Sequence, residues 1–168
     1  VAAEQPKELT AAAWRTALDP AGAWIGQVLR DADRRLSEVR KSVPDAGGLV
    51  LASDQRAARA YAKRLRELTG QQAVIVLSDD PGASSRIESF ASSGERWMVA
   101  VRMVSEGVDV PRLMVGVYAT STSTPLYFAQ AVGRFVRARR PGETASVFLP
   151  SVPRLLGHAA AMEAERDH

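Results

Sequence analysis

Five short apolar runs, rich in valine, leucine and alanine, mark the chain between residues 48 and 150. Runs this short and this continuous are typical of strands that a parallel sheet buries on both faces. The sequence therefore predicts five strands, at residues 49–52, 73–77, 97–101, 113–119 and 145–149.

Helical periodicity separates the first three of these runs. Between the first two, apolar residues recur every three or four positions, and Gly70 follows as a helix stop. Between the next two, Ser85 and Glu88 have the spacing of a capping box, and Gly94 marks the expected end of the helix. The order strand, helix, strand, helix, strand is thus predicted.

A further helix is predicted before the last strand. Thr124 has the character of an N-cap, Pro125 suits the first helical turn, and the helix should run to about Arg139 before Pro141 stops it. Alternation of this kind predicts an α/β fold, with a doubly wound, mainly parallel sheet of at least five strands.

The first 45 residues follow a different pattern. A long helix is expected to begin at Asp19 and Pro20, with one apolar stripe that needs a partner surface. That surface is either this domain's own sheet or a neighbouring domain. We therefore divide the chain into a helical appendage or linker (1–45), an α/β lobe (46–150) and a helical tail (151–168).

Composition excludes some kinds of functional site. The 168 residues contain no cysteine, which excludes disulfides and thiolate metal sites and fits a cytoplasmic location. The two histidines, His158 and His168, both lie in the tail, so no metal site is expected. No apolar run approaches the roughly 20 residues that cross a bilayer. The net charge of +3 is modest and discriminates little between classes of protein.

The strongest chemical signal lies in the helix predicted before the last strand. Gln130, Arg134 and Arg137 are spaced by four and then three residues, so they share one helix face. A solvated basic helix is the ordinary explanation of such a face. The surrounding string QAVGRFVR, residues 130–137, favours a specific function instead, because it resembles motif VI of superfamily 2 helicases.

A second resemblance lies upstream. Residues 105–111, SEGVDVP, follow a predicted strand directly and resemble motif V of the same superfamily. Gly107 lets backbone amides approach a phosphate, and Asp109 can accept hydrogen bonds from ribose hydroxyls. The chain thus resembles the C-terminal RecA-like lobe of DEAD/DEAH-type superfamily 2 helicases and translocases, closest to the restriction-enzyme and DNA-repair members.

The resemblance implies an ATP-driven motor. Arg137 and Arg134 would meet the charge that develops on the phosphoryl group transferred from ATP, and Gln130 would orient the attacking water. Nucleic acid, with DNA favoured over RNA, would lie across the carboxyl ends or the edges of the sheets of both lobes. Turn formation and helix capping are the ordinary roles of hydroxyl residues there. The candidate contacts to nucleic acid are Ser53, Thr120, Ser121 and Thr122.

The phosphate-binding half of such a motor is absent from the sequence. A P-loop ends in Gly-Lys-Ser/Thr, and none of the three lysines follows a glycine. We therefore expect a partner, an N-terminal RecA-like lobe of the same protein, to hold most of ATP and its Mg²⁺. The start at Val1 indicates a fragment, which alone should be inactive. Asp79 and Asp80 look like a magnesium-binding pair but are interpreted as a turn and a helix start.

Two other classes of function stay open. One is a non-catalytic nucleic-acid-binding or protein-binding domain derived from a helicase lobe, which would share every motif described above. The other is an unrelated flavodoxin-like nucleotide-binding module, which would explain the fold but not the Gln130, Arg134 and Arg137 pattern.

Overall fold

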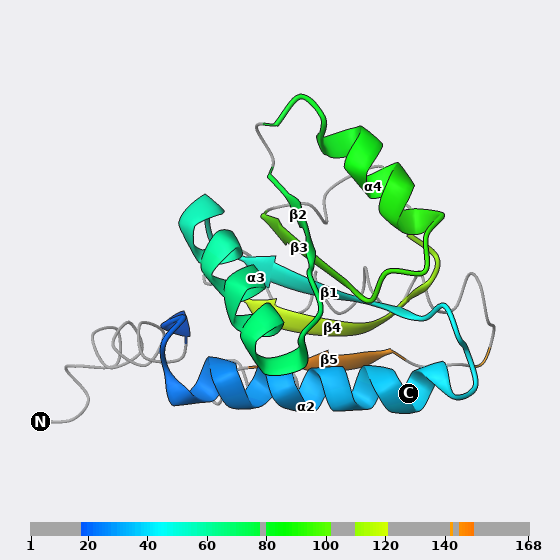
Figure 1. Cartoon of the computed structure of the whole chain (residues 1–168), viewed down its shortest axis with the longest axis horizontal. Coiled ribbons are helices and arrows are strands. Elements are labelled where there is room, and N and C mark those ends of the chain that lie inside the picture. The colour runs from blue at the N-terminus through cyan, green and yellow to red at the C-terminus, as the bar shows by residue number, and fades with distance from the viewer. Residues whose placement is uncertain (1–17, 78–79, 102–109, 121–141, 143–144, 150–168) are drawn as a thin grey trace, which may run out of the picture.

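A parallel five-stranded sheet is the centre of the structure (Figure 1). The computed structural model describes residues 18–77, 80–101, 110–120, 142 and 145–149. The strands lie in the order β2-β3-β1-β4-β5, and every neighbouring pair is parallel. The elements are α2 (Ala23–Arg40), β1 (Gly47–Ala52), α3 (Gln55–Thr69), β2 (Val74–Val76), α4 (Ala83–Ala91), β3 (Trp97–Val101), β4 (Leu113–Ala119) and β5 (Ser146–Phe148). The predicted fold class is confirmed, and the strands agree to within two residues.

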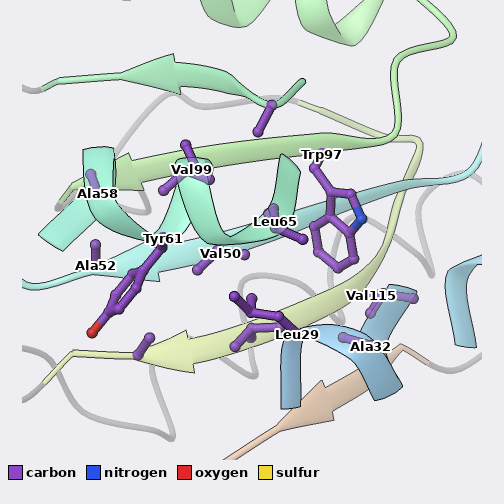
Figure 2. Close-up of a cluster of buried hydrophobic side chains, with 14 of the residues drawn as sticks. Leu29, Ala32, Val50, Ala52, Ala58, Tyr61, Leu65, Trp97, Val99 and Val115 are labelled. Carbon is purple, nitrogen blue, oxygen red and sulfur yellow. The ribbon is translucent and has the colours of Figure 1, made fainter. Parts of the chain in front are cut away.

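The strands send alternate side chains into two apolar layers. On one face, Val50 and Ala52 of β1 belong to a cluster with residues of α2 and α3 (Figure 2). On the other face, Leu49 and Leu51 belong to a cluster that includes Phe90 of α4. Because both faces of the sheet are covered, its strands are apolar at successive positions, which explains the continuous runs in the sequence.

The sequence of α3 explains both of its ends. Asp54 is the N-cap, and its carboxylate accepts a hydrogen bond from the backbone N–H of Ala57 at 2.7 Å. Gly70 follows the last turn with a φ of 75°, and its N–H donates to the carbonyl of Arg66 at 2.8 Å. Glycine adopts this left-handed conformation without a Cβ clash. The predicted stop at Gly70 is confirmed.

The predicted start of the first long helix is wrong. α2 begins at Ala23, with Gly22 as its N-cap, and not at Asp19 and Pro20. The residues before it form a turn instead. The Asp19 carboxylate accepts a hydrogen bond from the N–H of Ala21 at 3.0 Å, and its carbonyl accepts one from Gly22 at 2.9 Å.

From Ala23 onward, α2 packs on this domain's own sheet. Ile25, Leu29, Ala32 and Leu36 have no exposed surface. The helix contacts β4, β5 and α3, so the apolar stripe faces the first of its two possible partners. Helix and sheet share one apolar cluster. The division of the chain at residue 45 stays a prediction.

The predicted capping box of the second helix is also wrong. α4 begins at Ala83, with Gly82 as its N-cap, so Ser85 lies inside the helix. The turn before α4 is held by Asp80, whose carboxylate accepts a hydrogen bond from the N–H of Gly82 at 2.9 Å. An aspartate outside the helix thus stabilises its start, in place of the reciprocal pair that the spacing suggested.

The same helix ends before the predicted Gly94. Its last residue is Ala91. The hydroxyls of Ser92 and Ser93 donate to carbonyl oxygens of the last turn at 3.1 Å and 2.9 Å. Because these carbonyls have partners, the chain leaves the helix without a left-handed glycine.

Trp97, the first residue of β3, joins three elements. It is 1% exposed, and it pairs with Gly48 of β1 in the sheet register. A Cβ atom at Gly48 would lie 2.6 Å and 2.7 Å from ring atoms of Trp97. The indole N–H donates to the Asp33 carboxylate of α2 at 2.8 Å, and Arg96 Nη2 donates to the same oxygen at 2.8 Å. One carboxylate therefore fastens α2 to the start of β3.

Gly48→Ala tests the contact between β1 and the Trp97 ring. We expect the free energy of unfolding to fall by about 1–3 kcal/mol, because a buried ring and two strands would have to move apart. A matched change, Gly94→Ala, meets no atom within 4 Å. It should stay within about 0.5 kcal/mol of the parent. Urea denaturation measures both, and equal values for the two variants would contradict the packing argument.

Asp33→Ala tests the carboxylate that joins α2 to β3. Its removal leaves the Trp97 N–H and the Arg96 guanidinium, whose side chain is 18% exposed, without their acceptor. We expect a loss of about 2–3 kcal/mol in unfolding free energy. Asp31→Ala, on the same helix, breaks a more exposed 3.6 Å ion pair with Arg34 and an exposed 2.9 Å hydrogen bond from Gln27, and it should cost less than about 1 kcal/mol. A larger loss for Asp31→Ala would refute this assignment.

Candidate functional site

The carboxyl ends of the parallel strands meet at one edge of the sheet, here called the carboxyl edge. In open α/β sheets, ligands bind outside this edge at the strand where the chain reverses its direction of travel. In this sheet that strand is β1, because the chain goes from β1 to β2 on one side and later crosses to β4 on the other. The carboxyl edge beside β1 and β4 is therefore the candidate site.

Two of the predicted nucleic-acid residues lie together at this edge. β1 and β4 are neighbours, and their last residues, Ala52 and Ala119, are paired in the register. The next residue of each strand is Ser53 and Thr120, and the Ser53 hydroxyl donates to Thr120 Oγ1 at 3.1 Å. The sequence singled out both hydroxyls, but it held no signal that they pair, because pairing depends on which strands are neighbours.

The two hydroxyls differ in exposure. Thr120 is 1% exposed, whereas Ser53 is half-buried. The side chain of Thr120 accordingly orients Ser53, and of the two it is Ser53 that solvent or a ligand can reach. A direct contact of either residue with nucleic acid stays a prediction.

The start of α3 adds a negative charge to the carboxyl edge. Asp54 accepts the hydrogen bond from Ala57 that caps the helix. Its carboxylate therefore already occupies the partial positive end of the helix dipole. The Asp54 carboxylate therefore disfavours a phosphate on the axis of α3.

The remaining predicted site residues lie outside the described residues. They are Gly107, Asp109, Ser121, Thr122, Gln130, Arg134 and Arg137. The chain enters their two segments from Val101 at the end of β3 and from Thr120 after β4, both at the carboxyl edge. The roles assigned to these residues stay predictions.

Asp80 has a structural role in α4. Besides bonding Gly82, its carboxylate forms a 3.1 Å ion pair with Arg86. Arg86 also donates to the carbonyl of Ile75 in the edge strand β2 at 3.1 Å. The interpretation of Asp80 as part of a turn and helix start agrees with these contacts.

Two tyrosines near the carboxyl edge contribute no charge to it. Burial raises the pKa of the Tyr118 phenol to about 12. Burial, followed by the charges of Asp54 and Asp19, also raises the pKa of Tyr61, whose hydroxyl donates to the carbonyl of Leu18 at 2.5 Å. Both phenols therefore stay neutral at physiological pH.

Other features of the described chain lie away from this edge. A hollow of about 370 Å³ lies between α4 and β2, with Val74 and Phe90 among its lining residues, and contains none of the predicted site residues. Within the described ranges, no three acidic or histidine side chains are grouped as metal ligands would be. The helices in these ranges also lack the length or apolar character that spanning a membrane requires.

Mycobacterial proteins are similar in sequence to this chain. It is 65% identical over 161 residues to the uncharacterized protein Rv2917 of Mycobacterium tuberculosis (strain ATCC 25618 / H37Rv). It is 62% identical over 161 residues to the uncharacterized protein ML1624 of Mycobacterium leprae (strain TN). The match covers 96% of this chain but only 27% of each relative. No protein-family model matches the chain.

Solved helicase domains are similar in structure. The S. cerevisiae Dbp5 C-terminal domain bound to Gle1 and IP6 matches with a TM-score of 0.54 and 11% identity, over 81% of this chain and 80% of that one. The fold is that of a helicase C-terminal, RecA-like domain. Mss116p DEAD-box helicase domain 2, bound to an RNA duplex, gives a TM-score of 0.55 at 14% identity over 75% and 50% of the two chains. The Pyrococcus furiosus Hef helicase domain gives 0.51 at 16% identity over 78% and 28%.

A double-mutant cycle tests the pairing at the carboxyl edge of this RecA-like lobe. Ser53→Ala and Thr120→Val each remove one hydroxyl of the 3.1 Å hydrogen bond. We expect a coupling energy of about 0.5–1.5 kcal/mol in unfolding free energy, the ordinary contribution of such a bond. Urea denaturation of the parent, both single variants and the double variant gives the value. Strictly additive losses would show that the two hydroxyls do not interact.

Proposed function

We propose that this chain is the second motor lobe of an ATP-dependent nucleic-acid helicase or translocase. The supporting observation is the coincidence of fold and motif position. The fold is RecA-like, and the motif-like stretches 105–111 and 130–137 follow β3 and β4 in the chain, two strands that end at the carboxyl edge. Motif resemblance alone, or fold alone, would support the proposal less.

In the proposed motor, ATP lies between this lobe and a first lobe elsewhere in the same protein. Arg137 and Arg134 stabilise the charge on the transferred phosphoryl group, and Gln130 orients the attacking water. Gly107 and Asp109 contact a phosphate and the ribose. Mg²⁺ would neutralise charge at the phosphates, and its ligands are assigned to the first lobe because no lysine of this chain follows a glycine, as a P-loop requires.

The length of the relatives supports a two-lobe protein. This chain spans about a quarter of each mycobacterial relative. The rest of such a protein is long enough for another RecA-like lobe, since domains commonly contain about 100–200 residues. The proposed P-loop would then lie in another part of the protein than the part that this chain matches.

Nucleic acid is the proposed substrate of the motor. Ser53 is the half-exposed hydroxyl at the carboxyl edge, and it is held in place by Thr120. A hydroxyl fixed in this way suits a contact with the phosphate backbone, which positions a strand without reading its bases. The motif VI resemblance favours DNA, whereas the Mss116p domain is bound to an RNA duplex. Both nucleic acids therefore belong in the assay of ATP turnover.

Arg137→Ala in the full-length protein tests the motor. ATP turnover should fall by on the order of 10³ or more, whereas the dissociation constant for ATP should change far less. The reason is that the arginine meets full charge only as the phosphoryl group transfers. Steady-state kinetics with DNA or RNA and a nucleotide-binding assay give the two quantities.

Arg139→Ala is the matched control for this experiment. On the predicted helix it projects about 200° from Arg137, so turnover should stay within a few-fold of the parent. Equal losses in both variants, or a loss only at Arg139, would mean that the predicted face is not turned toward ATP. A full-length protein without any nucleic-acid-stimulated turnover would instead favour the non-catalytic binding domain.

A further inference from the structure

Positive charge is concentrated on α3. The helix Gln55–Thr69 contains five basic residues and one acidic residue, a net charge of +4. The whole chain carries only +3. By contrast, α2 contains four basic and three acidic residues. The modest charge of the chain therefore conceals one strongly cationic helix.

Four of the five cations share one exposed face. Arg56, Arg59, Lys63 and Arg66 are all exposed and are spaced by three, four and three residues. We call them the α3 cationic stripe. At about 100° and 1.5 Å per residue, they occupy a sector of about 80° and span about 15 Å along the helix. The opposite side of α3 packs into the core.

The stripe lacks carboxylate partners in the part of the chain that the structure describes. Within the described ranges, no carboxylate lies at ion-pair distance from any of its four members. This includes the carboxylate of Glu67, which lies one turn after Lys63. On α2, by comparison, Arg34 pairs with Asp31, and Arg35 pairs with Glu38. Exposed cations that repel one another along a helix cost stability, and an anionic partner would relieve that cost.

The stripe begins beside the carboxyl edge. Ser53 and Asp54 follow β1, and Arg56 stands in the first turn of α3. From there the helix runs back along the outside of the sheet (Figure 1). A ligand that contacts Ser53 can therefore continue directly along the stripe.

We propose that the α3 cationic stripe binds the phosphate backbone of nucleic acid and extends the contact that begins at Ser53. The proposal rests on the proposed function only for the presence of nucleic acid at the carboxyl edge. Phosphates of one strand of a duplex rise about 3.4 Å each along the helix axis, so a 15 Å stripe matches about four of them. Three of the four cations are arginines, which bind phosphate in a bidentate manner.

The exposed face of α3 favours nucleic acid over a membrane surface. Apart from the stripe, its exposed residues are Gln55 and Glu67. Helices that lie on membranes combine cations with exposed apolar residues that enter the acyl region. Because α3 exposes no large apolar side chain, its face is suited to a polyanion in water.

The experiment compares paired charge removals in the full-length protein without nucleotide. Arg59→Gln with Lys63→Gln removes two central members of the stripe, and glutamine preserves helix propensity. The probe is a fluorescein-labelled DNA duplex with a single-stranded tail, followed by anisotropy over a range of salt concentrations. At about 0.1 M salt we expect the dissociation constant to rise about tenfold or more, and the slope of log K against log salt to shrink by about 2.

Two further variants separate a binding role from a loss of net charge or of fold. Arg30→Gln with Arg34→Gln removes two exposed cations at the same spacing from α2, and binding should change by less than about threefold. Arg59→Lys with Lys63→Arg keeps the charges, and it should bind within a few-fold of the parent. Circular dichroism and thermal unfolding should be unchanged in all three variants.

Several outcomes would overturn the proposal. One is an equal loss of duplex affinity in the α2 and α3 double variants, and another is an unchanged duplex affinity in the α3 double variant. A third is an α3 double variant that loses binding to phosphatidylserine vesicles but still binds the duplex. The assay uses no ATP, so it is independent of the Arg137→Ala result. If the α3 pair loses duplex binding while Arg137→Ala keeps full ATP turnover, the proposed motor is refuted and the proposed role of the α3 cationic stripe is retained.

Discussion

The packing of Trp97 on Gly48, with the indole N–H bonded to Asp33, is the contact on which the arrangement of the lobe depends. It joins the central strand β1, its neighbour β3 and helix α2 at one end of the larger apolar cluster (Figure 2). Only glycine leaves room for the ring in β1, and only an acceptor on α2 satisfies the buried N–H. Since β1 also pairs with β4, this contact fixes the strand from which Ser53 leaves the sheet.

The arginines of the described chain have two kinds of surroundings. At the amino edge the arginines are bonded inward: Arg112 is 2% exposed, donates to the carbonyls of Phe90 and Asp45, and lies 4.1 Å over the Phe90 ring. Burial and the nearby Arg96 lower the pKa of Arg40, which still keeps its proton because arginine ionises so far above neutrality. On α3, by contrast, the four cations of the stripe are exposed. Arg112 therefore serves packing, whereas the α3 cationic stripe stays accessible.

Strong local signals predicted the structure correctly, whereas weak local signals and features that depend on strand order were not predictable from the sequence. The strands followed from continuous apolar runs, because a sheet covered on both faces requires them. Gly70 was predictable because a left-handed residue is needed there. The start of α4 was not, because the spacing of Ser85 and Glu88 also occurs by chance and Asp80 holds the turn instead. The Ser53–Thr120 pair needs β1 beside β4, which no local pattern encodes.

The ladder between β1 and β4 limits how a motor built on this lobe can move. It pairs six residues of each strand, from Gly47 and Leu113 to Ala52 and Ala119. The segment with the proposed ATP-facing arginines follows Thr120, and α3 follows Ser53. The 3.1 Å hydrogen bond between Ser53 and Thr120 contributes only about 1 kcal/mol, which is too little to couple the two segments alone. The β1–β4 ladder and the two apolar layers hold the ends of both strands in fixed positions relative to each other. In the proposed motor, closure over ATP would therefore move Ser53 and α3 as a rigid body, and stepping would come from motion of the whole lobe rather than from a bend within it.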